Sequence, residues 1–293
     1  MRSQRRSLEV SVSLQGGLGN QLFQYAAARA LAQRLNVKVR LDLALLSSHN
    51  EALATAREYA LKPFSLDIET YSSDINLCIG SRLLAPRRLL RVPRVFREES
   101  FSYDHRFDLI SEPVHLCGYF QSFKYSRAAS DLLISELGPR PIESKMGCYL
   151  QSELTSSESI AVHIRRGDYV TNPRANAKHG VLSPDYYQKA FQIIASKHKV
   201  DAIYLFSDDP DWLHTNRILD TSLRQIIVKD SVPPHEALWL MASAKHLVMA
   251  NSSLSWWSGK LSIGGGLIFA PQQWFHNSRT NLEDLLLPSW ITI

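Results

Sequence analysis

Residues 160–170 read IAVHIRRGDYV, and this stretch decides how the fold is interpreted. It begins as an apolar strand and then places His163, Arg165, Arg166 and Asp168 within six residues. Arginine and aspartate are almost never fully buried without a partner. The charges therefore predict the end of a buried strand, at a surface where a polar ligand can bind.

Short apolar runs alternate with helix-like segments through the second half of the chain. The apolar runs are SIAVHI, DAIYLFS, RQIIVK, KHLVMAN and GLIFAP, near residues 160, 204, 227, 248 and 269. The helix-like segments cover 184–199, 211–219, 234–245 and 254–262. This order predicts βαβ units around a parallel sheet, in which ligands bind outside the carboxyl ends of the strands.

The first half begins with the same pattern. A strand-like run over 10–14 leads into a glycine turn at 16–20, a helix over 21–35 and a second strand over 37–43. Glycines between a strand and a helix let backbone N–H groups face an anion at the helix N-terminus. An ordinary turn without a ligand is the alternative at this position.

Two lobes account for the repeated pattern. We expect an α/β fold with two Rossmann-like lobes, residues 1–142 and 143–293. The boundary is placed in LGPRPIESKMGC, residues 137–148, because proline and glycine cluster there.

Adjacent arginines at a strand end suit a diphosphate. A guanidinium is planar, always charged and carries a fork of donors that matches phosphate oxygens. Arg165 and Arg166 are therefore diphosphate candidates, with a surface salt bridge to Asp168 as the alternative. His163 by itself is more often a hydrogen-bonded core histidine. Asp168 suits orienting an arginine, capping the loop or acting as a base.

The stretch FSDDPDW, residues 206–212, follows another predicted strand. Asp208 and Asp209 are thus expected at the same ligand edge. Paired carboxylates can hold a divalent metal, or they can cap the next helix through its dipole. Pro210 suits the first turn of a helix, so Asp209 has two alternative roles, as the N-cap of that helix or as a residue of the site.

Polar residues also follow the strand near residue 248. Asn251, Ser252 and Ser253 lie between that strand and a predicted helix. Hydroxyl groups and free N–H groups at such a junction can bind an anion. These three residues are further candidates for binding an anion.

Composition favours a globular, cytoplasmic protein. Hydrophobic residues make up 45% and charged residues 21% of the 293 residues, close to the globular average. No window approaches the roughly 18 uninterrupted apolar residues of a membrane span. The basic start MRSQRR lacks the apolar stretch of a signal peptide. The cysteines, Cys78, Cys117 and Cys148, are widely spaced and odd in number, which predicts reduced thiols and neither a disulfide framework nor a zinc site.

Positive charge is concentrated in residues 81–100, which hold six arginines in a chain of net charge +5. Their interleaving with leucine and valine suggests a peripheral contact with an anionic membrane surface. A solvated arginine face or salt bridges are the alternatives. Nucleic-acid binding ranks low, because only Phe96 and Phe101 lie nearby as aromatic readers.

Four segments together resemble glycosyltransferase family 11, which includes the bacterial α-1,2-fucosyltransferases. They are GGLGNQLFQYAAARALA, HIRRGDYV, YLFSDDPDW and LVMANSSLSWWSGKL, in this order across residues 16–261. The resemblance covers nearly the whole chain and implies a GT-B fold with the site in the cleft between the lobes. It implies an inverting transfer of L-fucose from GDP-β-L-fucose to the 2-hydroxyl of a terminal galactoside.

The resemblance also implies roles for individual residues. Arg165 and Arg166 would hold the diphosphate, His163 would lie at the guanine, and Asn20 would lie near the sugar and phosphate. Ser252 and Ser253 would take phosphate oxygens, and Asp208 and Asp209 would shape the site. The donor-binding set is then Gly17, Gly19, Asn20, His163, Arg165, Arg166, Asp208, Asp209, Asn251, Ser252 and Ser253, and the catalytic set is Asn20, Arg165, Arg166 and Asp168.

One position departs from the family's pattern. An acidic residue usually stands where this chain has Ala237, and here the acid is Glu236, one residue earlier. An acidic contact to the guanine is therefore not assigned. Asp168, Asp208 and Asp209 are candidates for a general base by their chemistry alone.

No metal or other cofactor is expected, because two arginines and two helix N-termini already supply positive charge at the ligand edge. The partners are then GDP-fucose and a galactose-terminated glycan, without nucleic acid. A transferase that uses another nucleotide sugar and a non-catalytic GDP-sugar-binding protein are the alternatives.

Overall fold

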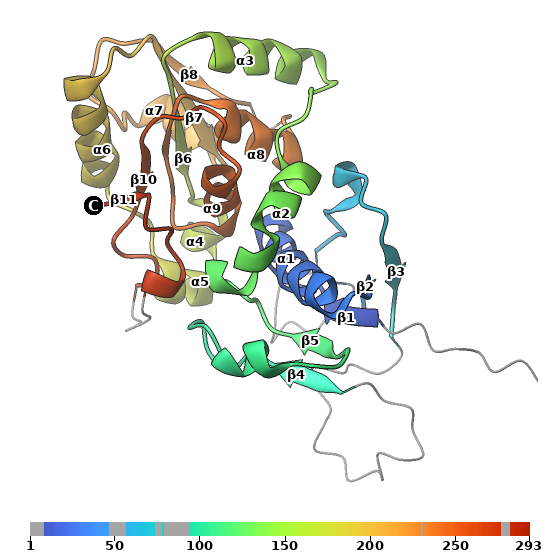
Figure 1. Ribbon diagram of the computed structural model, residues 1–293. Helices are drawn as coiled ribbons and strands as arrows, with labels where there is room; N and C mark the ends of the chain where they lie inside the picture. The colour runs from blue at the N-terminus through green and yellow to red at the C-terminus, as the bar shows by residue number, and fades with distance from the viewer. Residues whose placement is uncertain (1–8, 47–56, 74–77, 79–93, 230, 277–281) are drawn as a thin grey trace, which may run out of the picture. The chain divides into compact units, whose positions relative to one another are not determined.

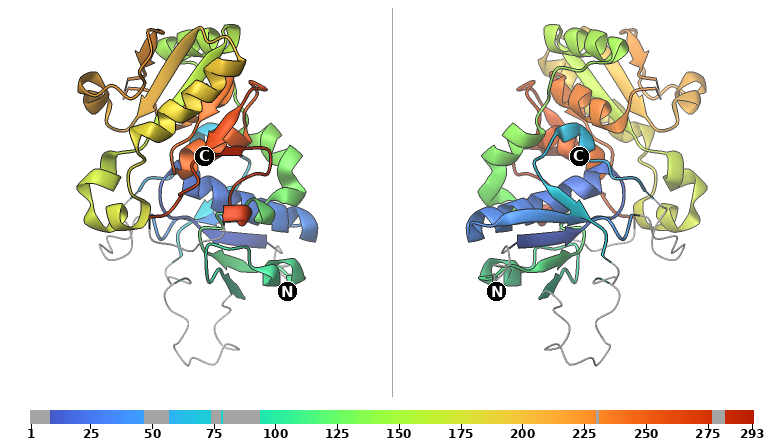
Figure 2. Two further views of the ribbon diagram at one scale, coloured as in Figure 1. Left: turned by 90° about the vertical axis from the view of Figure 1, so that its left-hand side faces the viewer. Right: turned by 90° about the vertical axis from the view of Figure 1, so that its right-hand side faces the viewer.

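The structure, a computed structural model, describes residues 9–46, 57–73, 78, 94–229, 231–276 and 282–293. It divides into two units, Met1–Glu136 and Leu137–Ile293. Each unit has a parallel sheet with helices packed on it (Figures 1 and 2). The predicted α/β fold with two Rossmann-like lobes is confirmed. None of the helices formed by the described residues is long and apolar enough to span a bilayer.

The first unit contains a five-stranded parallel sheet in the order β3-β2-β1-β5-β4 among its described residues. Its strands are β1 (Glu9–Ser13), β2 (Lys38–Asp42), β3 (Glu69–Tyr71), β4 (Val95–Arg97) and β5 (His115–Cys117). Its α-helices are α1 (Leu18–Leu35) and α2 (Ser130–Leu137). Short 3₁₀ helices lie at Lys62–Phe64, His105–Leu109, Phe123–Tyr125 and Arg127–Ala129.

Helix α1 is buried along most of its length and packs beside β1 and β2 (Figure 1). Its run of alanines lets the helix approach the sheet closely, and Val10 and Val12 of β1 are fully buried. The helix ends at Asn36, which adopts the left-handed conformation (φ 53°) and whose N–H bonds back to the carbonyl oxygens of Ala32 and Gln33. It begins at Leu18, three residues before the predicted start.

The described residues of the second unit form a six-stranded parallel sheet in the order β11-β10-β9-β6-β7-β8. Its strands are β6 (Ser159–Ile164), β7 (Ala202–Ser207), β8 (Gln225–Ile227), β9 (His246–Val248), β10 (Ile268–Ala270) and β11 (Ile291–Thr292). Its helices are α3 (Lys145–Ser156), α4 (Gly167–Thr171), α5 (Pro173–His179), α6 (Pro184–Lys197), α7 (Pro210–Thr215), α8 (Pro234–Ser243) and α9 (Ser253–Lys260), and a 3₁₀ helix covers Leu282–Asp284.

Alternation along β6 separates a core face from a site face. Ile160, Val162 and Ile164 pack in one core cluster with α6 and α7. Because successive strand residues point to opposite faces, His163 projects to the other side of the sheet, where α8 lies (Figure 2). The same strand therefore stabilises the lobe and presents a polar residue to a pocket.

The division between the units falls at Glu136/Leu137, whereas the sequence placed it after residue 142. Contacts with the second unit explain the difference. The indole N–H of Trp239 donates to the Leu137 carbonyl (3.0 Å), and the side chain of Gln151 donates to the Arg140 carbonyl (2.9 Å). Residues 137–142 are thus bonded to the second unit.

The expectation that the cysteines are reduced thiols is wrong for two of the three. Cys78 and Cys117 form a disulfide across 39 residues, and Cys148 is an exposed free thiol. Cys117 ends β5, and its partner comes from a segment far away in the sequence. The spacing of the cysteines alone does not reveal this pairing, because it depends on how the strands are ordered.

Most of the arginine-rich stretch 81–100 lies outside the described residues, which resume at 94. Arg94 pairs with Glu112 (2.7 Å), and Arg97 donates to the Cys78 carbonyl. These two arginines therefore have protein partners, and membrane contact by the stretch stays a prediction.

Candidate functional site

The carboxyl ends of β6 and β7 bring the two charged stretches together. The strands are adjacent and parallel, and Ile164 pairs in register with Ser207. Arg165 and Arg166 follow the first strand, and Asp208 and Asp209 follow the second. Residues 42 or more positions apart in the sequence thus meet at one sheet edge, as the βαβ pattern predicts.

Three carboxylates hold the two arginines. Arg165 donates from Nη2 to Asp168 Oδ1 (2.6 Å) and pairs through Nη1 with Asp208 Oδ2 (2.9 Å). Arg166 donates from Nε to Asp209 Oδ2 (3.1 Å). The orienting role considered for Asp168 agrees with this geometry. Each arginine is fixed at the sheet edge before any ligand binds.

Arg166 is also stacked on an aromatic ring. Its guanidinium carbon lies 3.7 Å from the centroid of the Trp212 ring, and its side chain is only 16% exposed. Cation–π contact adds to the ion pair with Asp209 in fixing this guanidinium. Among the residues that the structure describes, Nη1 and Nη2 of Arg166 have no hydrogen-bond partner, so both terminal nitrogens remain available to a ligand.

Asp209 has two structural roles at once. Its Oδ1 accepts from the backbone N–H of Trp212 (3.2 Å) and caps α7, while its Oδ2 holds Arg166. The N-cap alternative from the sequence is therefore present together with the contact to the arginine. Asp208 Oδ1 accepts from the backbone N–H of Arg166 (2.8 Å) and closes the turn after β6.

Helix α4 begins directly after the arginines, where the sequence had predicted a loop. Gly167, its first residue, lies so close to Asp208 that a Cβ added there would collide with the carboxylate. The hydroxyl of Tyr169, in the same helix, donates to the Asn251 carbonyl (3.0 Å). The short helix thus ties the β6 edge to the segment that follows β9.

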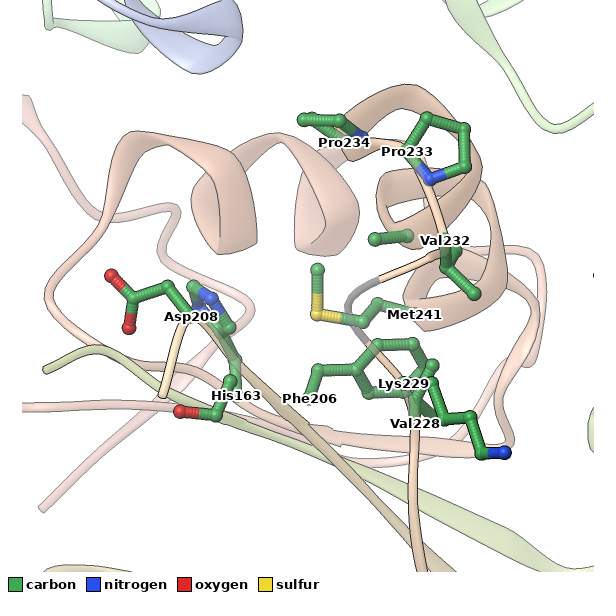
Figure 3. Close-up of a pocket in the computed structure, with 11 residues that line it drawn as sticks. His163, Phe206, Asp208, Val228, Lys229, Val232, Pro233, Pro234 and Met241 are labelled. Carbon is green, nitrogen blue, oxygen red and sulfur yellow. The ribbon is translucent and has the colours of Figure 1, made fainter. Parts of the chain in front are cut away.

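A pocket of about 410 Å³ opens beside this cluster (Figure 3). Phe206 and Met241 provide apolar surface, while His163 and Asp208 lie together at one side of the pocket. The full lining is His163, Phe206, Ser207, Asp208, Val228, Lys229, Val232, Pro233, Pro234, Ala237 and Met241. An apolar pocket with a few polar groups suits a flat ring system that carries hydrogen-bonding edges.

His163 is buried in the pocket wall, with 4% of its surface exposed. Burial, together with the positive charge of Arg165, lowers the pKa of His163 to about 4. Its Nδ1 atom has no hydrogen-bond partner within the described part of the chain. The imidazole is therefore neutral at pH 7, with a buried Nδ1 that makes no bond to the described residues.

Glu236 faces away from the pocket. Its carboxylate accepts from the Ser144 hydroxyl (2.7 Å), and Ser144 is the N-cap of α3. Ala237 lines the pocket in its place. The acid that is displaced by one position thus stabilises a helix start and does not line the pocket.

Asn251 and Ser252 bond mainly to the protein itself. The Asn251 amide donates to the carbonyls of His179 (2.8 Å) and Trp274 (3.3 Å), and the residue is 1% exposed. Ser252 caps α9 by accepting from the Leu254 N–H (3.3 Å), and Ser253 is the first residue of that helix. Their predicted contacts with phosphate stay predictions.

The glycine turn of the first unit differs from its expected form. Gly16 has the positive φ (77°), whereas Gly17 is the N-cap of α1. Gly19 and Asn20 lie inside the first turn of the helix. Asn20 Oδ1 accepts from Gln121 Nε2 (2.7 Å), which fixes the amide at the carboxyl end of the first sheet.

Several residues of the site were missed in the sequence. Gly167 and Trp212 lie within quoted motifs but were not assigned to the site. Lys229 and Met241 also line the pocket and were not assigned to the site from the sequence. Gln121 comes from the stretch that was least legible, and only the structure shows that it reaches Asn20.

Comparison with known proteins gives the family. The sequence profile of glycosyl transferase family 11 matches residues 2–293. The chain therefore belongs to glycosyl transferase family 11, as its motifs predicted.

Two curated relatives are similar to nearly the whole chain. An α-1,2-colitosyltransferase of Escherichia coli is 28% identical over 97% of this chain and 98% of its own length. The O-antigen biosynthesis glycosyltransferase WbnK of E. coli is 28% identical over 96% of this chain and 99% of its own. Among solved structures, NodZ α-1,6-fucosyltransferase co-crystallized with GDP is 15% identical over 88% of this chain and 93% of its own, with a TM-score of 0.49.

Proposed function

We propose that the protein is a galactoside α-1,2-fucosyltransferase, which transfers L-fucose from GDP-β-L-fucose to a galactose 2-hydroxyl with inversion. The observation that carries the proposal is the pair of oriented arginines beside a 410 Å³ pocket at one sheet edge. The pocket would take the guanine, and the arginines would face the diphosphate. Membership of the family supports a glycosyl transfer.

Arg166 is the arginine best prepared for the leaving group. Asp209 and Trp212 orient its guanidinium, and its Nη1 and Nη2 atoms make no hydrogen bond to the described protein. Negative charge builds on the diphosphate as the bond to the sugar breaks, and a donor held in position stabilises that charge without reorganising. Arg165, already held by Asp168 and Asp208, would have to exchange a carboxylate oxygen for a phosphate oxygen.

A single displacement requires the acceptor hydroxyl to lose a proton. Asp168, Asp208 and Asp209 were candidates for the base, but each accepts hydrogen bonds from an arginine or from a backbone N–H. Protonating any of them would break the bonds that position the arginines. We therefore assign none of them as the base.

Turnover is the direct test. GDP-fucose should be consumed only when a galactoside is present, and NMR of the product should show an α-1,2 linkage. Binding of GDP-fucose without turnover on any galactoside would favour the non-catalytic alternative.

The pocket can be tested apart from turnover. Ala237→Leu adds side-chain volume to the lining, so GDP should bind more weakly while the melting temperature changes little. Ala195→Leu is the matched control, because Ala195 is exposed on α6 and remote from the lining. Equal GDP affinity in both variants would place the guanine elsewhere.

A second donor has specific support. The E. coli relative is named an α-1,2-colitosyltransferase and matches nearly the whole chain. Colitose differs from fucose by the loss of the 3-hydroxyl, so the two GDP-sugars can be compared in one reaction. A higher kcat/KM with the colitosyl donor would identify colitose, and not fucose, as the transferred sugar. The proposed roles of the arginines would stay the same.

A further inference from the structure

A polar cluster lies on the sheet of the first unit, where apolar side chains are expected. His115 and Cys117 are two residues apart on β5 and therefore project from the same face. Ser11 is the register partner of His115 on β1, and Ser13 lies two residues further on that strand. His115, Ser13 and Cys117 are all buried. Burying polar groups is costly unless their partners are well placed.

Cys78 completes the cluster. One ligand atom each from Cys78, His115 and Cys117 lies within 4.8 Å of the other two. The Cys78 sulfur is 4.0 Å from His115 Nε2, and it is joined to the Cys117 sulfur as a disulfide. Two sulfurs and one imidazole nitrogen therefore converge on one point.

Hydrogen bonds orient the imidazole toward the sulfurs. Ser11 Oγ lies 2.8 Å from Nδ1, and Ser13 Oγ lies 2.8 Å from Nε2. With Nδ1–H donating to Ser11, the lone pair of Nε2 faces Ser13 and the Cys78 sulfur. Metal-binding histidines almost always hold their other ring N–H in this way, because the bond fixes the tautomer and the ring orientation.

We propose that Cys78, His115 and Cys117 bind one zinc ion once the disulfide is reduced. Two thiolates and one imidazole form a zinc ligand set, and water or the Ser13 hydroxyl would fill the fourth position. The two thiolate charges balance the dication inside a buried site. The soft sulfur ligands select against magnesium and calcium.

The disulfide and the metal exclude each other, because both use the same two sulfurs. Two molecules of a small thiol, or one phosphine and one water, reduce the disulfide by two electrons to two thiols, and the reductant leaves as a disulfide or a phosphine oxide. The two cysteine thiols then release two protons to solvent as the zinc–sulfur bonds form. The cluster thus has an oxidised, metal-free state and a reduced state that binds metal.

Cobalt(II) gives the test a spectroscopic signal. The full chain is reduced with a phosphine, moved to anaerobic buffer without reductant and titrated with Co²⁺. We expect the visible and thiolate charge-transfer absorption of tetrahedral cobalt, which saturates at one equivalent and is removed by Zn²⁺. The oxidised chain should show no such absorption. Its absence from the reduced chain would overturn the proposal.

Variants separate the cluster from other thiols. Cys148→Ser removes the exposed thiol of the second unit and should leave the cobalt spectrum unchanged. Cys117→Ser should abolish the charge-transfer band, and a band that survives would contradict the assignment. Ser11→Ala should weaken metal affinity by about ten-fold or more while the disulfide still forms. Unchanged affinity in Ser11→Ala would contradict the orientation given to His115.

Alkylation of the wild-type chain tests zinc binding by Cys78 and Cys117 even if Cys117→Ser fails to fold. Zn²⁺ should slow the reaction of iodoacetamide with Cys78 and Cys117 in the reduced protein, as followed by mass spectrometry of the peptides. Cys148 should react at the same rate with and without zinc. Equal protection of all three cysteines, or of none, would reject the site.

Discussion

The guanidinium carbon of Arg166 lies 3.7 Å from the centre of the Trp212 ring, one turn into the helix that Asp209 caps. The aromatic ring limits the tilt of the guanidinium, and the bond from Nε to Asp209 limits its rotation. The terminal nitrogens Nη1 and Nη2 make no hydrogen bond to the described residues. A side chain with this many fixed contacts behaves as part of the scaffold.

Replacing Arg166 by Lys should lower kcat by about 100-fold or more, because an ammonium group cannot reproduce the planar fork. Trp212→Leu removes only the stacking and should cost less, on the order of 0.5–1 kcal/mol of transition-state stabilisation. Steady-state kinetics with melting temperatures would show both effects. Near-normal kcat in both Arg166→Lys and Arg165→Lys would show that neither arginine stabilises the leaving diphosphate.

Substitutions of Asp209 should separate its two roles. Asn is a good N-cap but carries no charge, so Asp209→Asn should keep the melting temperature and lower kcat. Asp209→Ala loses the cap as well and should destabilise the protein by about 1 kcal/mol. Denaturant unfolding and kinetics on the same samples give both quantities. A fully active Asp209→Asn variant would show that the ion pair with Arg166 is dispensable.

Metal chelation should not affect transfer. All four carboxylate oxygens of Asp208 and Asp209 accept from protein donors, so a divalent ion would have to break those contacts to bind. We expect the same initial rate in excess EDTA as in Mg²⁺ or Mn²⁺. A rate that EDTA abolishes and Mn²⁺ restores would assign the two aspartates to a metal. The proposed zinc site is a separate matter, because its test measures binding and not turnover.

Stability should fall as the pH drops from 6.5 toward 4. Burial lowers the pKa values of His163, His115 and His179 to about 4, against an ordinary value of 6.5. Between these values the unfolded chain binds protons that the folded chain does not, so acid favours unfolding. The contribution of the three neutral histidines to the free energy of unfolding is fully present above pH 6.5. Melting temperatures measured across this window provide the check.

Titration of Glu98 should change the stability of the fold with pH in the direction opposite to that of the three histidines. Burial raises the pKa of its carboxyl from 4.5 to about 7, so between these values the folded chain holds a proton that the unfolded chain releases. Its contribution to stability is therefore lost as the pH rises toward 7. Glu98→Gln should steepen the rise of melting temperature with pH below 6.5. A slope unchanged by this substitution would mean that Glu98 titrates alike in both states.

Apolar runs were sufficient to predict the second lobe. Strands β6 and β7 are long, β-branched or aromatic, and followed by charge, so their type and the sheet edge at which the charged residues meet were predicted correctly. Strands β3, β4 and β5 are only three residues long and carry polar residues such as His115, so no periodicity marks them. Helix α4 was missed because it starts at Gly167, a residue that disfavours helices.

Prediction of the site was limited because the motifs do not show which side chains bond to one another. The motifs identified the arginines and aspartates, and strand order was enough to bring them to one edge. The motifs did not show that Asp209 serves the helix and the arginine together, or that Glu236 bonds to Ser144. Such contacts depend on rotamers and on segments far apart in the sequence, as does the Cys78–Cys117 disulfide.

Chain length between β7 and α7 is fixed by Asp209. One oxygen of its carboxylate accepts a hydrogen bond from the N–H of Trp212, and the other accepts one from Arg166. The carboxylate therefore cannot shift along the chain without losing one of these two hydrogen bonds. A single residue inserted between Ser207 and Pro210 would displace it by up to about 3.8 Å, more than the length of either bond. Beyond Asn216, where α7 has ended, added residues leave the guanidinium in place. Insertions and deletions compatible with function should therefore be confined to the far end of that helix.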